Sequence, residues 1–195
     1  MDTALIVIDM QNGFCSPDGS LPQYVLQMPN MGDVVDAISD LIATCRAARL
    51  PVIYTRLVWP DRNDCPARLL SNFPPHIHPL APGTDSAIID ELAPRNEDTV
   101  IDKKTFNAFL GTDLDERLRR MGVKELVVAG VMTNVCVEST VRHASDLNYT
   151  VRVASDCTTG FPDLRDASLQ VLQMIFAEQV APWRECLEMV TSSGE

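Results

Sequence analysis

Residues 130–140, Gly130-Val131-Met132-Thr133-Asn134-Val135-Cys136-Val137-Glu138-Ser139-Thr140, mark the point where a strand gives way to a helix. The run before them, 125–129, is short and apolar like a buried strand, and residues 135–147 carry apolar side chains at a helical period. Thr133 or Asn134 is the expected N-cap. Cys136 therefore falls in the first helical turn, where the helix dipole favours a thiolate. The position predicts either a reactive cysteine or a small buried hydrophobe.

The same alternation of strand and helix extends through the rest of the chain. Strands are expected at 3–8, 50–55, 98–102, 125–129, 149–154 and 175–180, and helices at 34–48, 86–92, 113–121, 135–147, 163–174 and 182–190. This order predicts an α/β fold, namely a three-layer αβα, Rossmann-like, six-stranded and mostly parallel sheet with helices on both faces. We expect residues 1–195 to form a single domain, because 195 residues are hardly enough for two. The sequence contains none of the glycine-rich nucleotide motifs of such sheets.

Charge and cysteine usage restrict the classes of partner. The net charge is −11, from 16 basic and 27 acidic residues, which argues against nucleic acid and anionic membranes as partners. The first residues lack the basic region of a signal peptide, and no apolar window reaches transmembrane length. The six cysteines are scattered without a C-x-x-C pair, as in a cytoplasmic protein with reduced thiols.

None of the three histidines is an obvious base for a cysteine nucleophile. His143 follows Cys136 by two helical turns, roughly 10 Å, which places it out of reach. His76 and His78 lie in the irregular, proline-rich stretch 56–84, and two histidines without a nearby carboxylate are too few for a metal site. A loop of this length in a compact domain is usually functional or a lid.

Carboxylates and lysines at strand ends remain as candidates. Asp9 follows the first expected strand, Asp156 follows the fifth, and Lys103 and Lys104 follow the third. A carboxylate beside a lysine is able to take the proton of a thiol such as Cys136.

Three separated stretches resemble the isochorismatase-like cysteine hydrolases, a family that includes nicotinamidases, N-carbamoylsarcosine amidohydrolase, and biuret, maleamate and ureidoacrylate hydrolases. Residues 5–14 resemble the D-x-Q-x-x-F opening of this family, residues 103–109 its K-x-R-Y-S-A-F stretch, and residues 127–137 its G-V-x-T-x-x-C-V block. The resemblance covers nearly the whole chain.

The resemblance implies a catalytic triad of Asp9, Lys103 and Cys136. Asp9 would take the thiol proton and return it to the leaving amine, Lys103 would stabilise the thiolate, and Cys136 would form a thioester. The backbone N–H groups of Met132 and Cys136 would hold the oxyanion. The family also implies a cis peptide bond between Val131 and Met132 in this loop. The choice of Lys103 over Lys104 depends on counting six residues back from Phe109, which ends the motif.

Two departures from the family pattern bear on function. Thr105-Phe106-Asn107 replaces the usual Arg-Tyr-Ser of a stretch that helps line the pocket in this family, so the resemblance leaves the choice of substrate open. The D-x-H metal motif of nicotinamidases reads Arg56-Leu57-Val58-Trp59, so we expect no metal and no other cofactor. Because Cys136 is present, we predict hydrolysis of the C–N bond of a small amide, ureide or carbamoyl compound. The protein is also expected to be cytoplasmic and to form a homo-oligomer, either a dimer or a tetramer. The alternatives are an isochorismatase-type vinyl ether hydrolase and a catalytically silent binding protein.

Three aromatic residues are expected to form the substrate pocket. Phe14, Trp59 and Phe106 each follow an expected strand closely, with Asn107 and Asn134 as possible polar contacts. Apolar walls with few polar groups suit a compact, uncharged amide, so a dicarboxylate such as isochorismate should be a poor substrate. Ordinary core or subunit-interface packing is the alternative for each aromatic side chain.

Overall fold

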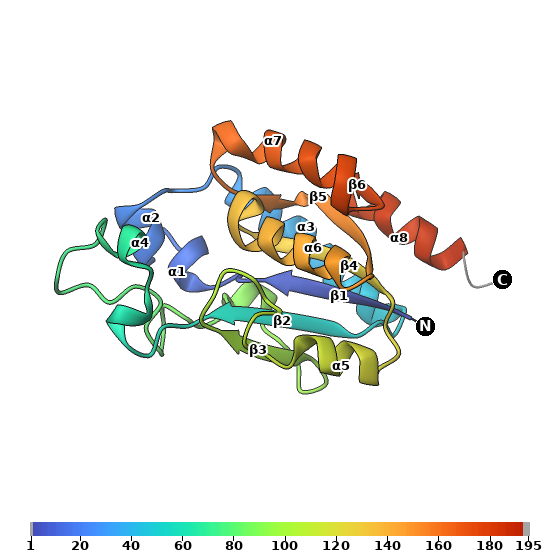
Figure 1. The fold of residues 1–195 in the computed structure, drawn as a ribbon, viewed down its shortest axis with the longest axis horizontal. Helices are drawn as coiled ribbons and strands as arrows, with labels where there is room; N and C mark the ends of the chain where they lie inside the picture. The colour runs from blue at the N-terminus through green and yellow to red at the C-terminus, as the bar shows by residue number, and fades with distance from the viewer. Residues whose placement is uncertain (1, 193–195) are drawn as a thin grey trace.

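Six parallel strands form the centre of the computed structural model, which describes residues 2–192 (Figure 1). The strands are β1 (Thr3–Ile8), β2 (Val52–Leu57), β3 (Thr99–Lys103), β4 (Glu125–Val131), β5 (Thr150–Thr159) and β6 (Gln179–Ala181). They lie in the order β3-β2-β1-β4-β5-β6, and every adjacent pair is parallel. The sheet therefore confirms the predicted Rossmann-like α/β fold, with its switch point between β1 and β4.

Helices cover both faces of this sheet. They are α1 (Asn12–Cys15), α2 (Ser20–Tyr24), α3 (Met31–Ala47), α4 (Ala67–Leu70), α5 (Leu114–Arg120), α6 (Glu138–Asp146), α7 (Pro162–Val171) and α8 (Trp183–Ser192). The two helices α3 and α8 contact each other and the sheet, whereas α6 and α7 contact β5 and the turns beside them. Figure 1 shows α1, α2 and α4 gathered at the carboxyl ends of the strands. Among residues 2–192, no helix combines the length and the apolarity needed to cross a bilayer.

The core is formed by strands that are buried on both faces. All six residues of β1 are buried, as are six of the seven residues of β4. An apolar run without alternation is typical of a strand covered by helices on both sides, which is why the sequence indicated these two strands correctly.

Several helix and strand boundaries predicted from the sequence are wrong. The sixth strand was expected at 175–180, but residues Leu172–Phe176 form a π-helical turn, η4, that continues α7, and β6 begins only at Gln179. Met174 and Ile175 are exposed, so this apolar run does not mark a buried strand. The fifth strand extends beyond its expected end to Thr159, and the expected helix at 86–92 is only a 3-10 turn, η2, over Asp90–Leu92. Short apolar runs do not distinguish strand from helix by periodicity alone.

Gly130 allows β4 to approach β1 at the switch point. Its φ is +112°, and a Cβ atom there would lie 2.1 Å from the backbone oxygen of Ile8. Only glycine fits such a close approach of two backbones. The loop that carries Cys136 is thereby brought next to the residue that follows Ile8.

The segment between β2 and β3 folds over the carboxyl ends of the strands. It contains α4 and a second 3-10 turn, η1 (Arg62–Asp64). The Asp85 carboxylate accepts hydrogen bonds from the backbone N–H and the hydroxyl of Ser20, at 3.0 and 2.6 Å, and this contact fixes the segment to α2. The Arg62 guanidinium donates to the Ile77 carbonyl at 2.8 Å within the segment. This long stretch is therefore an ordered cover, as its length in the sequence suggested.

Candidate active site

Asp9 directly follows β1 and is fully buried. Its φ of +53° lies in the left-handed region, which Asp adopts more readily than most residues, and the strand ends there. One carboxylate oxygen accepts a hydrogen bond from the Thr55 hydroxyl at 2.7 Å, and the other accepts one from the Lys103 ammonium at 2.7 Å. Since Thr55 belongs to β2 and Lys103 ends β3, three strands together fix the orientation of this carboxylate.

Lys103 has an entirely buried side chain that forms an ion pair with Asp9. Its ammonium group also donates to the backbone carbonyls of Thr105 and Phe106, at 3.0 and 3.2 Å. Lys104, the next residue, is largely exposed and forms an ion pair with a carboxylate of the covering segment instead. Of the two adjacent lysines, the structure therefore brings Lys103 to Asp9.

Cys136 lies in a single π-helical turn, η3 (Thr133–Val137), between β4 and α6, and it is only 1% exposed. The peptide bond between Val131 and Met132 is cis, as the resemblance implied. Lys103, Asp9 and the backbone of Met132 all lie close enough to the Cys136 thiol to influence its pKa. The three side chains that the resemblance placed in one triad thus meet at the switch point of the sheet.

The protonation states of this cluster follow from burial and from charge. Burial raises the pKa of the Cys136 thiol, Lys103 lowers it, and Asp9 raises it, so that the net shift is upward. Burial lowers the pKa of Lys103, but the negative charge of Asp9 and the interaction with the Cys136 sulfur outweigh this effect and raise it. Burial therefore disfavours the Cys136 thiolate, while Asp9 and Lys103 form an ion pair beside the sulfur.

The structure does not place Cys136 at the α-helix N-terminus that was expected to lower the pKa of its thiol. Cys136 lies within a π turn and not in the first turn of an α-helix. Neither expected N-cap acts as one, since the Thr133 hydroxyl bonds to the Thr158 hydroxyl at 2.8 Å and the Asn134 amide is engaged elsewhere. Burial, which the sequence did not reveal, dominates the pKa.

A cavity of about 250 Å³ opens above Cys136. Phe14, Trp59 and Phe106 all line it, as the sequence analysis expected. Every other lining residue in the described chain is also apolar, apart from Cys136 itself. The indole N–H of Trp59 donates to the Lys104 carbonyl at 3.0 Å, so its hydrogen bond is already formed within the protein.

The two asparagines expected in the pocket do not line this cavity. The Asn107 side-chain nitrogen bonds to the His143 ring at 2.7 Å, and its oxygen accepts from the Phe109 backbone N–H at 2.9 Å. The Asn134 oxygen accepts from the Phe161 backbone N–H at 3.0 Å. Both amides thus hold neighbouring backbone and side chains in place. The sequence alone does not show whether an asparagine beside a catalytic motif contacts the substrate or supports the residues around it.

The three histidines lie outside the triad. His143 stacks against Phe109, with ring centroids 5.4 Å apart, and the His78 ring bonds to the Trp59 carbonyl at 2.8 Å. Within residues 2–192, no three His, Cys, Asp or Glu side chains gather as a potential metal site.

Two buried polar residues that support the site were not singled out from the sequence. The Thr55 hydroxyl orients Asp9. In the sequence, the only indication of this role was a hydroxyl at the end of an apolar strand. Gln11 lies in the D-x-Q stretch, where its amide donates to the Leu57 and Ser86 carbonyls and accepts from the Leu57 N–H. Gln11 therefore joins the end of β2 to the covering segment. Its position in the motif was the available signal.

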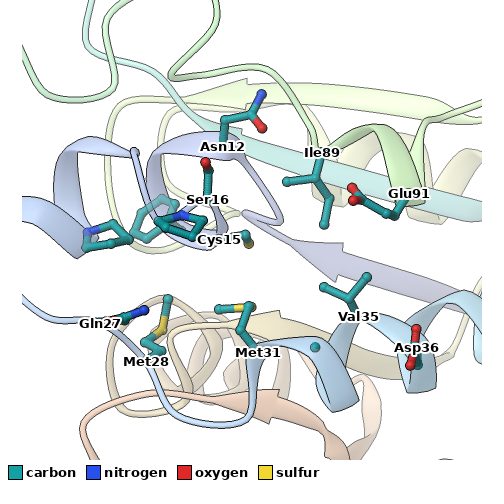
Figure 2. A pocket seen from close by; sticks show the side chains of 14 residues that line it. Asn12, Cys15, Ser16, Gln27, Met28, Met31, Val35, Asp36, Ile89 and Glu91 are labelled. Carbon is teal, nitrogen blue, oxygen red and sulfur yellow. The ribbon is translucent and has the colours of Figure 1, made fainter.

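A second cavity of about 510 Å³ lies on the other side of Phe14, between α1 and the start of α3. In Figure 2 the Cys15 thiol lies beside this cavity, with Met28 and Met31 on the opposite wall. Burial raises the pKa of Cys15 to about 12, and the negative charges of Asp9 and Glu91 contribute to the increase. Among the described residues, no lysine or arginine lines this larger cavity.

Comparison with known proteins places the chain in one class of enzymes, the isochorismatase-like hydrolases. Residues 3–181 match the model of the isochorismatase domain. Ureidoacrylate amidohydrolase RutB of Methylorubrum extorquens is 32% identical over 191 residues, which cover 89% of this chain and 77% of that relative.

Solved structures agree with this assignment. A cysteine hydrolase from Pseudomonas syringae pv. phaseolicola is 32% identical, with a TM-score of 0.85 over 98% of this chain and 93% of that one. N-carbamoylsarcosine amidase from Thermoplasma acidophilum is 28% identical, with a TM-score of 0.77 over 93% of this chain and 96% of that one. The chain belongs to the isochorismatase family, and the resemblance stated from its sequence motifs is confirmed.

Proposed function

We propose that this chain is a cysteine-dependent amidohydrolase that cleaves the C–N bond of a small amide, ureide or carbamoyl compound through a thioester. The observation that carries the proposal is the contact among Asp9, Lys103 and Cys136 beside an apolar cavity. The names of the relatives support the same bond type, since one is an amidohydrolase and another an amidase.

Acylation begins with a proton transfer inside the buried cluster. Asp9 takes the proton of the Cys136 thiol, and the negative charge moves from oxygen to sulfur while Lys103 stays charged beside both. The number of buried charges does not change, which makes the transfer compatible with a site closed to water. The thiolate then attacks the substrate carbonyl, and the N–H groups of Met132 and Cys136 stabilise the oxyanion.

Collapse of the tetrahedral intermediate breaks the C–N bond. Asp9 returns its proton to the leaving nitrogen, so that ammonia or an amine departs and the acyl group stays on Cys136 as a thioester. In the second half, Asp9 takes a proton from water, the hydroxide attacks the thioester, and the proton returns to sulfur as the acid leaves. Thr55 holds Asp9 in one orientation through both halves.

The proposal is tested by a screen of small amides, ureides and carbamoyl compounds for release of ammonia. We expect at least one neutral compound to be hydrolysed by the wild-type protein and by none of the variants Cys136→Ala and Asp9→Asn. Isochorismate is tested in the same assay, because its cleavage is the reaction of the alternative function, the vinyl ether hydrolase. Cleavage of isochorismate that persists in Cys136→Ala would replace the amidohydrolase with the vinyl ether hydrolase, and no turnover of any compound would favour a silent binding protein.

Three further expectations accompany this proposal. We propose that residues 1–195 form one domain, that the protein acts in the cytoplasm, and that it assembles as a dimer or tetramer. Gel filtration with light scattering measures the assembly directly.

A further inference from the structure

The cavity above Cys136 differs from the binding site that an acidic substrate requires. The covering elements contribute only apolar side chains to it, among them Val25 from the end of α2, Leu69 from α4 and Phe161 from the start of α7. We propose that this cavity selects neutral carboxamides and ureides with a branched or aromatic group and rejects those that carry a carboxylate. This inference rests on the proposed amidohydrolase function and adds the class of substrate.

The cations of the surrounding elements are engaged away from the cavity. Lys103 is bonded to Asp9 and to two carbonyls, and Arg56 forms two hydrogen bonds with Asp102. Arg165 donates to the carbonyls that end β5. None of these three side chains lines the cavity.

Three more cations lie on or beside the covering segment, and none of them lines the cavity. The Arg62 guanidinium donates to backbone carbonyls of that segment, and Lys104 pairs with Asp64 outside the cavity. Arg68 precedes Leu69 in α4, but it is exposed and does not line the cavity. A substrate carboxylate would therefore meet aliphatic and aromatic carbon where the acyl group has to lie.

Of two substrates with the same shape, the apolar cavity should strongly prefer the neutral one over the one that carries a carboxylate. A carboxylate that leaves water for an apolar site without a partner is far less stable there than a branched alkyl group. The amide end faces the thiol and the backbone N–H groups of the η3 turn, so polar recognition is confined to the reacting group.

The volume indicates how large the apolar group is. An apolar cavity of about 150 Å³ holds a benzene molecule. The 250 Å³ above Cys136 is therefore sufficient for one ring or a branched chain together with the amide. The relative RutB is named for ureidoacrylate, which is an acid, so this inference separates the present chain from that substrate.

Leu69 is the position where the preference should be most easily reversed. It is half-buried on a short helix of the covering segment, so a longer cationic side chain there has room to reach both the cavity and solvent. Ala67, one of the other residues of the same helix, is exposed and does not line the cavity, which makes Ala67→Arg a matched control for an added charge.

The experiment compares two pairs of compounds in which an isopropyl group replaces a carboxylate of similar shape. The amide pair is 4-methylpentanamide and succinamate, and the ureide pair is (3-methylbutyl)urea and 3-ureidopropanoate. Ammonia release gives kcat/KM for the wild type, Leu69→Arg and Ala67→Arg. Calorimetric titration of Cys136→Ala with the same four compounds gives Kd without any reaction.

We expect the wild type to prefer the neutral member of at least one pair by about 100-fold or more in kcat/KM, and Cys136→Ala to bind it correspondingly more tightly. Leu69→Arg should reduce this preference by at least about tenfold, and Ala67→Arg should leave it unchanged. Equal or better turnover of the acids by the wild type would overturn the inference and leave the amidohydrolase intact. Tight binding of a neutral compound without turnover would instead contradict the amidohydrolase alone. Failure of Cys136→Ala to bind either neutral compound would overturn the inference as well.

Discussion

Two thiols lie near Asp9, that of the buried Cys136 and that of the half-buried Cys15, and they differ in what surrounds them. Cys136 lies beside a cavity of about 250 Å³ with Lys103 in contact, whereas Cys15 lines a cavity of about 510 Å³ without a lysine or arginine among its described walls. Burial raises the pKa of both thiols, and Asp9 raises both further. Only at Cys136 does a cation act in the opposite direction.

This comparison shows that cavity size and burial do not identify the nucleophile. Among the described residues that line the larger cavity there is no lysine or arginine to stabilise a thiolate, whereas the smaller cavity lies beside an ion pair whose negative charge is able to move onto sulfur. A buried lysine between a carboxylate and a thiol is the feature that separates a site able to react from an ordinary buried cysteine.

Removal of each thiol should separate the two sites most strongly. We expect Cys136→Ala to lower kcat by at least about 10⁴-fold, because no other group forms the thioester. Cys15→Ala should change kcat/KM by less than about threefold, since Cys15 faces the other cavity. The measurement is ammonia release from the best amide of the screen. Comparable losses in the two variants would remove the distinction between the sites.

The two adjacent lysines should differ in both activity and stability. Lys103→Ala leaves Asp9 buried without its cation, so we expect kcat/KM to fall at least about 100-fold and the free energy of unfolding to fall by about 3–5 kcal/mol. Lys104 is exposed, and Lys104→Ala should alter stability by less than about 1 kcal/mol. Kinetics and urea denaturation of both variants test this. An inactive Lys104→Ala beside an active Lys103→Ala would show that the motif is shifted by one residue.

Thr55 acts on the reaction through Asp9 and is a positioning residue. Thr55→Val removes the hydroxyl that donates to the Asp9 carboxylate, so we expect kcat to fall about tenfold with KM nearly unchanged. Thr55→Ser keeps the hydroxyl and should recover most of the activity. Equal activity of the valine and serine variants would mean that this hydrogen bond does not contribute to catalysis.

The effect of pH on stability should be the same for the two thiols. Both have a folded-state pKa above the value of about 8.5 in the unfolded chain, so above that pH the unfolded state binds fewer protons than the folded state. Stability therefore falls as pH rises, by at most about 1.4 kcal/mol per pH unit for each thiol. Cys15→Ala and Cys136→Ala should each make the decline between pH 8.5 and 10 shallower by the same amount in urea denaturation. A decline that only one variant alters would contradict burial as the common cause.

The sequence predicted the parts of the molecule that depend on local pattern. Unbroken apolar runs indicated the central strands, and the residues after them, Asp9, Lys103 and Cys136, meet in the structure because the carboxyl ends of parallel strands share one edge. The resemblance distinguished Lys103 from Lys104, which the pattern alone left open.

Features that depend on tertiary packing were not predictable in the same way. The raised pKa of Cys136 depends on its complete burial, and the contributions of Val25, Leu69 and Phe161 to the cavity depend on how α2, α4 and α7 pack together. Asn107 and Asn134 were expected as polar contacts of the substrate. In the structure, Asn107 bonds to the His143 ring, and Asn134 accepts a hydrogen bond from the Phe161 backbone N–H. The apolar run in η4 continues a helix where a strand was expected.

Cys136, and not Cys15, is expected to carry the acyl group during turnover. The most direct measurement is mass spectrometry of the protein quenched in acid during turnover of a neutral amide, followed by peptide mapping. We predict an added acyl mass on the peptide that contains Cys136, absent from Cys136→Ala and retained in Cys15→Ala. An acyl mass on Cys15, or turnover of the amide that survives in Cys136→Ala, would contradict the account.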